Sequence, residues 1–228
     1  MSYYGSYYPK YVSRAELRSR AQQSLKKSQK SNLNRNPVIV LGNNIACSWW
    51  GKAWNTNLER YADYSNRIGR GRSYLRHGLV LDLNINPGLV TGEVQGSRST
   101  PYEVNIKIKP INKKSWNTIK NNCQSKIESL QKLIEGDFPK ELEEIFTMKG
   151  SGLFPTPSEI TFDCTCPDWA SMCKHVAAVL YGIGVRLDED PKLFFVLRKA
   201  LIDDLITEAV KEKTNKMLKT SKNKTKRV

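Results

Sequence analysis

Apolar and polar residues alternate most regularly between residues 79 and 108, and this pattern predicts three β-strands. In the first strand every second residue is apolar and is expected on one face: Leu79, Leu81, Leu83 and Ile85. An Asn-Pro-Gly turn at residues 86–88 leads into a second strand over residues 89–95. The third strand has an inward set of its own: Tyr102, Val104, Ile106 and Ile108. Strands joined by short turns predict an antiparallel meander.

Apolar residues at helical spacing predict helices before this sheet. Ser13-x-x-Glu16 is typical of a capping box, but the helix it would open, to about residue 30, has a sparse apolar stripe. That helix is expected to pack weakly and to form fully only on binding. Residues 38–41, VIVL, predict a short strand. Ser48 is then expected to cap a helix whose stripe faces the core, with a base-stacking platform as the alternative; the stripe is Trp50, Trp54, Leu58 and Tyr61.

Further helices are expected after the sheet. Residues 115–148 have a helical pattern that breaks near residues 136–139. Residues 148–159 are rich in Gly, Pro and Ser, which predicts a connector and a domain boundary. A last amphipathic helix is expected over residues 202–210.

Arginine and glycine are concentrated at residues 66–78, NRIGRGRSYLRHG. Its three glycines predict a loop. Arginine interleaved with tyrosine can both neutralise phosphates and stack on bases, whereas the alternative is a solvated basic loop. With one arginine on the turn before the third strand, the expected nucleic-acid contacts are Arg67, Arg70, Arg72, Tyr74, Arg76 and Arg98.

The net charge of +15 is concentrated at the two ends of the chain. Residues 10–35 hold eight basic residues against Glu16, and residues 211–228 hold eight against Glu212, so the body between them is close to neutral. Two cationic arms suit a protein that grips a polyanion, but partly disordered, solubilising ends explain the charge equally well. The 39% hydrophobic content suffices for a core, and neither a membrane span nor a secretory signal is evident, so the cytoplasm is the expected location.

Three of the five cysteines and one of the two histidines lie between residues 164 and 175. Cys164 and Cys166 would share one face of a strand. Cys173 and His175 would lie on nearly opposite faces of a helix, so Cys173 is expected before the helix and His175 at its start. Four such ligands suit a closed, tetrahedral, structural Zn²⁺ site. Three buried thiols and a core histidine are the alternative.

The spacing Cys164-x-Cys166, six residues, then Cys173-x-His175, with its CPDW and CKHVAAVLY phrases, resembles the SWIM zinc finger. The resemblance implies a small zinc module that binds nucleic acid or protein. Such modules occur in transposases and in bacterial proteins associated with Swi/Snf-type helicase-like ATPases. The segments WWGKAWN, RIGRGRSYLRHG and VQGSRSTPYEV also resemble the amino-terminal part of bacterial stand-alone SWIM proteins.

Motifs for catalysis are missing from the sequence: it has no Gly-rich phosphate loop with Lys-Ser/Thr, no serine elbow and no His-Glu-x-x-His. We therefore expect no enzymatic activity. Cys47 and Cys123, left over from the expected metal site, are interpreted as reduced, buried structural thiols.

The expected fold is α+β, with an antiparallel three- to four-stranded sheet and helices, then a zinc-stabilised hairpin-helix module and C-terminal helices. The expected parts are a basic, partly disordered arm (1–36), an α+β domain (37–150), the SWIM module (151–200), and a helix with a basic tail (201–228). One functional hypothesis is a zinc- and nucleic-acid-binding protein, with DNA as ligand, accessory to a Swi/Snf-type helicase. The other is an adaptor whose finger and sheet bind a partner protein without touching nucleic acid.

Overall fold

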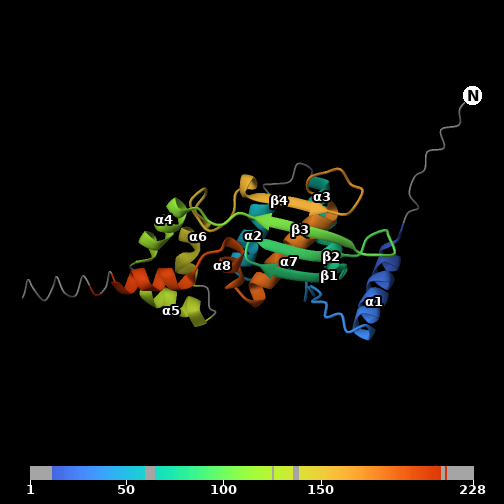
Figure 1. Ribbon diagram of the computed structural model, residues 1–228, viewed down its shortest axis with the longest axis horizontal. Helices are drawn as coiled ribbons and strands as arrows, with labels where there is room; N and C mark the ends of the chain where they lie inside the picture. Colours follow the sequence, from blue (N-terminus) through green and yellow to red (C-terminus); the bar gives the residue numbers. More distant parts are fainter. Residues whose placement is uncertain (1–11, 60–64, 125, 136–138, 212–213, 215–228) are drawn as a thin grey trace, which may run out of the picture.

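A four-stranded antiparallel sheet lies at the centre of the computed structural model (Figure 1), which describes residues 12–59, 65–124, 126–135, 139–211 and 214. The strands follow the order β1-β2-β3-β4. Their bounds are β1 (Val80–Asn86), β2 (Leu89–Val94), β3 (Tyr102–Ile108) and β4 (Ile160–Cys164). The first three form the predicted meander, and the inward set of the third strand is buried as expected. The α+β prediction is confirmed.

A β-bulge in β1 changes which residues face the main core. The pairing of β1 with β2 shifts between Val80 and Asp82, which leaves Leu81 as an additional residue. Before the bulge, Leu79 and Leu81 pack with α1, whereas Leu83 packs in the main core with Val80. The prediction of one common face for the alternating leucines of this strand is therefore wrong, because one additional residue reverses the alternation.

Helix α1 (Arg14–Lys30) is attached to the sheet by apolar packing and by a hydrogen bond. It begins after Ser13, whose hydroxyl accepts a hydrogen bond from the Glu16 N–H at 3.2 Å, as the sequence predicted. Its short apolar stripe packs on the bulged part of β1. The Arg20 guanidinium donates to the Ser97 carbonyl on the turn before β3, at 2.6 Å.

Residues 38–41 do not form the predicted strand. The Val38 N–H donates to the Val80 carbonyl, and the Leu83 N–H donates to the Asn36 carbonyl. Three residues, 36–38, therefore lie beside four residues of β1, 80–83. Because the bulge makes this spacing irregular, a regular ladder does not continue. The chain then leaves the sheet, and the side chain of Ile39 is 64% exposed.

Helix α2 (Trp49–Glu59) presents its aromatic stripe to the core, as expected. Ser48 caps it by accepting a hydrogen bond from the Gly51 N–H at 3.1 Å. Trp54 and Leu58 are fully buried, which favours the core interpretation over a stacking platform for these two residues. Tyr61, the fourth member of the stripe, lies outside the described residues.

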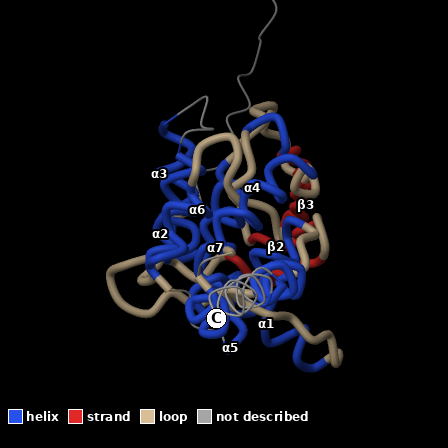
Figure 2. The backbone as a smooth tube through the Cα atoms, turned by 90° about the vertical axis from the view of Figure 1, so that its left-hand side faces the viewer, coloured by secondary structure: helices blue, strands red, loops and turns tan. Residues whose placement is uncertain are grey.

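The arginine- and glycine-rich segment is a helix, α3 (Ser65–Arg76), so the prediction of a loop is wrong. It packs against α7 (Lys174–Glu189), the long helix that also contacts α2 and the sheet. Ile68 and Leu75 of α3 are buried in these contacts. Figure 2 shows α2, α3 and α7 grouped beside the strands. Burial along α7 outweighs the low helix propensity of the glycines in α3.

Four further helices belong to the described part of the fold: α4 (Lys113–Cys123), α5 (Ile127–Glu135), α6 (Glu143–Thr147) and α8 (Leu193–Arg198), with short 3-10 turns at Lys140–Leu142 and Pro157–Glu159. Three of them, α4, α5 and α6, lie at the other end of the molecule from α1 (Figure 1). Residues 202–211 are also helical, as expected. In the part of the chain that the structure describes, no helix is long and apolar enough to cross a bilayer.

The strand of the predicted finger belongs to the same sheet as the three strands before it. Ile106 of β3 lies opposite Phe162 of β4, more than fifty residues later in the chain. Side chains from both sides of residue 150 share one hydrophobic core. The division at residue 150 stays a prediction about which parts fold independently.

Candidate metal centre

The first two sulfur ligands stand at the end of β4. Cys164 lies opposite Val104 of β3 and is the last residue of the strand. Thr165 continues the pairing by one residue: its N–H donates to the Glu103 carbonyl at 3.1 Å, and its hydroxyl accepts from the Glu103 N–H at 3.0 Å. With Thr165 bonded to β3, Cys164 and Cys166 are left to share the metal centre, as the two-residue spacing predicted.

The other two ligands stand where α7 begins. Cys173 is the N-cap residue, and its sulfur accepts the Val176 N–H at 3.4 Å. His175 is the second residue of the helix, and both side chains are buried. Cys173 therefore precedes the helix and His175 opens it, as predicted.

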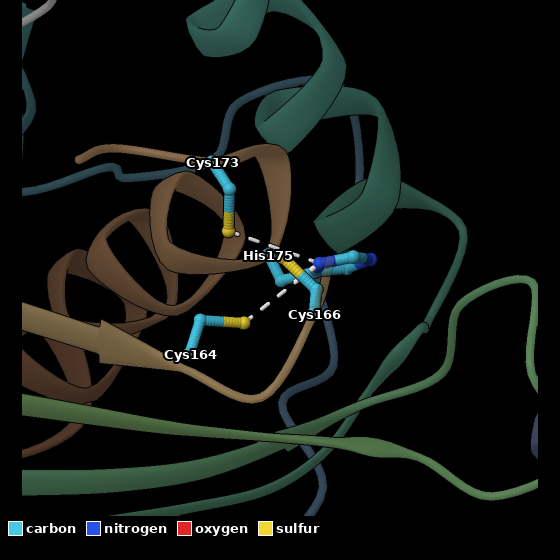
Figure 3. Close-up of side chains that lie close together, drawn as sticks. All are labelled: Cys164, Cys166, Cys173 and His175. Atoms are coloured by element: carbon cyan, nitrogen blue, oxygen red, sulfur yellow. Dashed lines mark hydrogen bonds between the residues drawn. The ribbon is translucent and has the colours of Figure 1, made fainter. Parts of the chain in front are cut away.

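The four side chains converge on one point (Figure 3). Their ligand atoms all lie within 4.8 Å of one another. His175 Nδ1 lies 3.9 Å from the Cys164 sulfur and 3.8 Å from the Cys173 sulfur. Tetrahedral zinc, with bonds of about 2.3 Å to sulfur and about 2.0 Å to nitrogen, needs a sulfur–nitrogen separation of about 3.6 Å. Cys164, Cys166, Cys173 and His175 are thus positioned to bind one zinc ion.

The protonation chemistry of the centre suits a cation. Burial lowers the pKa of His175, which keeps the imidazole neutral and able to donate a lone pair. A hydrogen bond from the Cys164 thiol, together with His175 and the Val176 N–H, lowers the pKa of Cys173. That shared hydrogen bond and burial raise the pKa of Cys164, and burial raises the pKa of Cys166. Three thiolates this close together would repel one another, so a divalent ion is needed to stabilise all three.

Aromatic rings hold the imidazole in place. The Tyr102 ring lies 4.5 Å from the His175 ring, and the Tyr74 ring meets it edge-on at 5.5 Å. A Cβ at Gly96 would come within 2.8 Å of His175 Nε2 and 2.3 Å of the Tyr102 ring, so only glycine fits there. His175 Nε2 is buried and has no hydrogen-bond partner among the described residues. The ring is fixed by packing, with Nδ1 toward the sulfurs.

Three of the predicted nucleic-acid residues form ion pairs or hydrogen bonds with other parts of the chain. Arg67 pairs with Asp168 in the finger loop, the residues 167–172 between Cys166 and Cys173. Arg72 pairs with the Glu59 carboxylate at 2.6 Å and donates to the Tyr181 hydroxyl. Arg76 is exposed, although its guanidinium donates to a backbone carbonyl at residue 43, at 3.0 Å.

The other three predicted residues, Arg70, Tyr74 and Arg98, lie around the metal centre. The Tyr74 ring contacts His175. Burial raises the pKa of the Tyr74 hydroxyl, and the positive charge of Arg70 offsets part of this rise. The Arg98 guanidinium lies 5.0 Å from the centre of the Tyr102 ring. Arg70 and Arg98 are both exposed. A helix and a distant turn thus bring their cations to one site.

Sequence reasoning missed two residues of the site, Lys174 and Tyr102. The Lys174 ammonium lies 5.9 Å from the centre of the Tyr74 ring. The sequence offered one signal for Lys174, namely its position between the two metal ligands Cys173 and His175. Tyr102 gave none, because its alternation with other apolar residues indicated only a core position.

A strand, a short loop and a helix that hold three sulfurs and one imidazole around a single point define a zinc-finger protein. Residues 160–182 match the family described as SWIM zinc finger, which supports the resemblance seen in the sequence. A stretch of 163 residues, 71% of the chain, is 39% identical to a Mycobacterium tuberculosis protein described as "Uncharacterized protein Rv2102". The chain spans 58% of that relative's length. No solved structure matches the chain significantly.

Proposed function

We propose that this chain is a zinc-binding, nucleic-acid-binding protein that acts on DNA in the cytoplasm, is accessory to a Swi/Snf-type helicase and has no enzymatic activity. The zinc centre and the SWIM match support a role in binding nucleic acid or protein. The helicase link rests on the sequence resemblance. Its test is ATP hydrolysis by such an ATPase on DNA, measured with and without this chain.

The observation that carries the proposal is the gathering of cations and aromatic rings around the metal centre. We call the exposed or half-buried members of this group, Arg70, Tyr74, Arg98 and Lys174, the zinc-side surface. Guanidinium and ammonium groups neutralise phosphates, and an accessible ring can stack on a base. Because the Tyr74 ring packs against His175, a zinc ion bound to His175 would keep this part of the surface rigid.

Helix α1 extends the positive charge beyond the zinc-side surface. Arg20 of α1 bonds to the turn that carries Arg98, so the helix is attached beside it. The other basic side chains of α1 are exposed: Arg14, Arg18, Lys26, Lys27 and Lys30. In a chain of net charge +15, this arrangement favours a polyanionic ligand.

The lack of enzymatic activity is part of the proposal and follows from the site's chemistry. Four protein ligands would fill the tetrahedral positions of zinc and leave none for an activated water. The other histidine, His77, donates its Nδ1 proton to the Ser73 carbonyl at 2.6 Å. Each imidazole therefore has a structural role.

Binding to random-sequence DNA across a range of salt concentrations tests the proposal. For a protein that contacts several phosphates, the logarithm of the binding constant falls linearly with the logarithm of the salt concentration. The slope is about −0.9 for each phosphate contacted. We expect such a slope for the zinc-loaded chain. Negligible DNA affinity at low salt would contradict the proposal.

One observation favours the adaptor as a second candidate. The segment after α1 exposes three large apolar side chains: Leu33, Ile39 and Leu41. It borders a groove of about 540 Å³ between α1 and the end of α3, with Ala21, Leu25 and Leu75 in its lining. Exposed apolar surface beside a groove is typical of protein-binding sites. A chain that captured a protein partner but no nucleic acid would support this alternative.

A further inference from the structure

The finger loop exposes a large aromatic side chain. Trp169 lies between the ligands Cys166 and Cys173, and 82% of its surface is accessible. Exposing an indole to water does not stabilise the fold, because burial of apolar surface is what favours folding. A tryptophan kept exposed at this position is therefore better explained by binding than by stability.

The loop around Trp169 is anchored on both sides. The preceding residue, Asp168, pairs with Arg67 of α3, and its carboxylate also accepts the Ala170 N–H at 3.3 Å. Zinc ligands close the loop three residues before the indole and four residues after it. Trp169 is thus presented by a fixed backbone, which reduces the entropy lost when it binds a ligand.

Positive charge lies on the helix to which the loop is anchored. The ion pair of Asp168 holds the loop against the amino-terminal half of α3, and Figure 1 shows the segment after β4 beside this helix. Arg70 lies one helical turn beyond Arg67 and is exposed. Asp168, the acidic neighbour of Trp169, is already neutralised by its own ion pair. An exposed ring on a loop held against a helix with an exposed cation matches a base and its phosphate.

We infer that Trp169 stacks on an unpaired base, so that the nucleic acid recognised by the zinc-side surface is single-stranded; this rests on the proposed nucleic-acid function. In a duplex the faces of the bases are covered by their neighbours, whereas a single strand exposes them. Every base has such a face, so stacking requires no particular sequence. The six residues between Cys166 and Cys173 leave little room for side chains that read base edges.

The test compares the zinc-loaded parent chain with Trp169→Ala, Trp169→Phe and Arg70→Gln. Each is titrated with a 20-nucleotide oligo-dT, an oligo-U and a blunt 20-base-pair duplex at two salt concentrations, and zinc content verifies the fold. We expect Trp169→Ala to lose about 5- to 100-fold in single-strand affinity, with an unchanged salt slope and little change on the duplex. Phe should restore part of the loss. Arg70→Gln should instead make the salt slope shallower by the amount that about one phosphate contact contributes.

Intrinsic fluorescence gives a second readout. The other four tryptophans are buried or half-buried, so quenching by a stacked base should come mainly from Trp169. The quenching should disappear in Trp169→Phe even though that variant still binds.

The outcomes separate this inference from the proposed function. If the parent binds single strands tightly and Trp169→Ala binds them equally well, stacking is overturned while nucleic-acid binding stands. Equal losses on single strand and duplex also overturn it, because the indole would then not distinguish an unpaired base. If the parent binds none of the three ligands, the proposed function itself fails. Binding of oligo-U with the same Trp169 dependence supports stacking, since RNA exposes the same base faces.

Discussion

Gly71 of α3 lies directly against Ala177 of α7. A Cβ at position 71 would come within 2.4 Å of the Ala177 Cβ and within 2.8 Å of its backbone carbonyl carbon. This close approach seats α3 on the helix that begins in the metal centre. Gly69 belongs to the same helix, yet a Cβ there would meet nothing within 4 Å.

These two glycines should respond in opposite directions to alanine. Gly71→Ala must separate α3 from α7, and we expect it to lower the free energy of unfolding by about 1–3 kcal/mol. Gly69→Ala, the matched control, should raise it by about 0.5–1 kcal/mol through helix propensity. Urea unfolding of the two zinc-loaded variants measures both effects. Equal effects of the two substitutions would show that α3 and α7 are not in close contact.

The same glycines explain why the sequence indicated a loop at α3. A glycine that breaks a helix and a glycine that allows two helices to touch are identical in a single sequence. Only the position of α7, a hundred residues later, distinguishes them. The β1 bulge was missed for a similar reason, because it depends on how that strand pairs with β2.

The zinc ligands were predictable because all four lie within twelve residues, so local strand and helix geometry decides how they converge. The placement of β4 beside β3 is a long-range pairing that no local pattern reveals. The sequence likewise grouped six nucleic-acid candidates, and the structure separates them: Arg67 and Arg72 pair with carboxylates, whereas Arg70 and Arg98 remain exposed near the centre.

The ligand set predicts one zinc per chain. Protein purified without chelator should contain about one equivalent, and the double variant Cys166→Ser, Cys173→Ser should contain almost none. It should also lose order in β4 and the start of α7, because metal binding and local folding are coupled. Metal analysis by mass spectrometry, together with amide hydrogen exchange, measures both.

Cys47 and Cys123 provide the control for zinc content. Cys47 is exposed, so the expectation of a buried thiol is wrong for this residue, whereas Cys123 is buried and its thiol pKa is raised to about 12 by burial. Neither belongs to the cluster of four metal ligands among the described residues. Cys47→Ser should therefore change nothing, whereas Cys123→Ala should lower stability through a small cavity and leave the zinc content unaltered. Loss of zinc from either single variant would mean that the ligands are assigned wrongly.

The partly buried ion pair of Arg198 and Glu159 predicts a pH dependence. The Arg198 side chain is only 2% exposed and lies 3.0 Å from the Glu159 carboxylate. Burial alone would raise the pKa of Glu159, but the Thr156 N–H and Arg198 outweigh it and lower the pKa. The carboxylate therefore stabilises the fold above its unfolded pKa of about 4.3, and this contribution is lost as the pH falls through the lower folded pKa.

Glu159→Gln should reveal this contribution. At pH 7 the variant leaves Arg198 buried without its counter-charge, at a cost of about 3 kcal/mol. The difference from the parent should narrow below about pH 4, where the parent carboxylate is protonated as well. Denaturant unfolding at each pH measures the difference, and zinc release in acid affects both proteins alike. The exposed Glu141→Gln is the control; a difference between Glu159→Gln and the parent that is constant with pH would exclude the ion pair as its cause.

The last prediction divides nucleic-acid binding between the carboxyl-terminal basic segment and the zinc-side surface. Removing residues 211–228 deletes eight basic residues, so it should weaken binding to all sequences alike and flatten the salt slope. The double variant Arg70→Gln, Arg98→Gln should make the salt slope shallower by the amount that about two phosphate contacts contribute. Arg72→Gln is the control: it breaks the ion pair with Glu59 and should change nucleic-acid binding little. Fluorescence anisotropy with labelled DNA at several salt concentrations measures each slope. If the deletion abolishes binding while the Arg70, Arg98 variant binds like the parent, the folded body is not the nucleic-acid surface, and the adaptor becomes the better hypothesis.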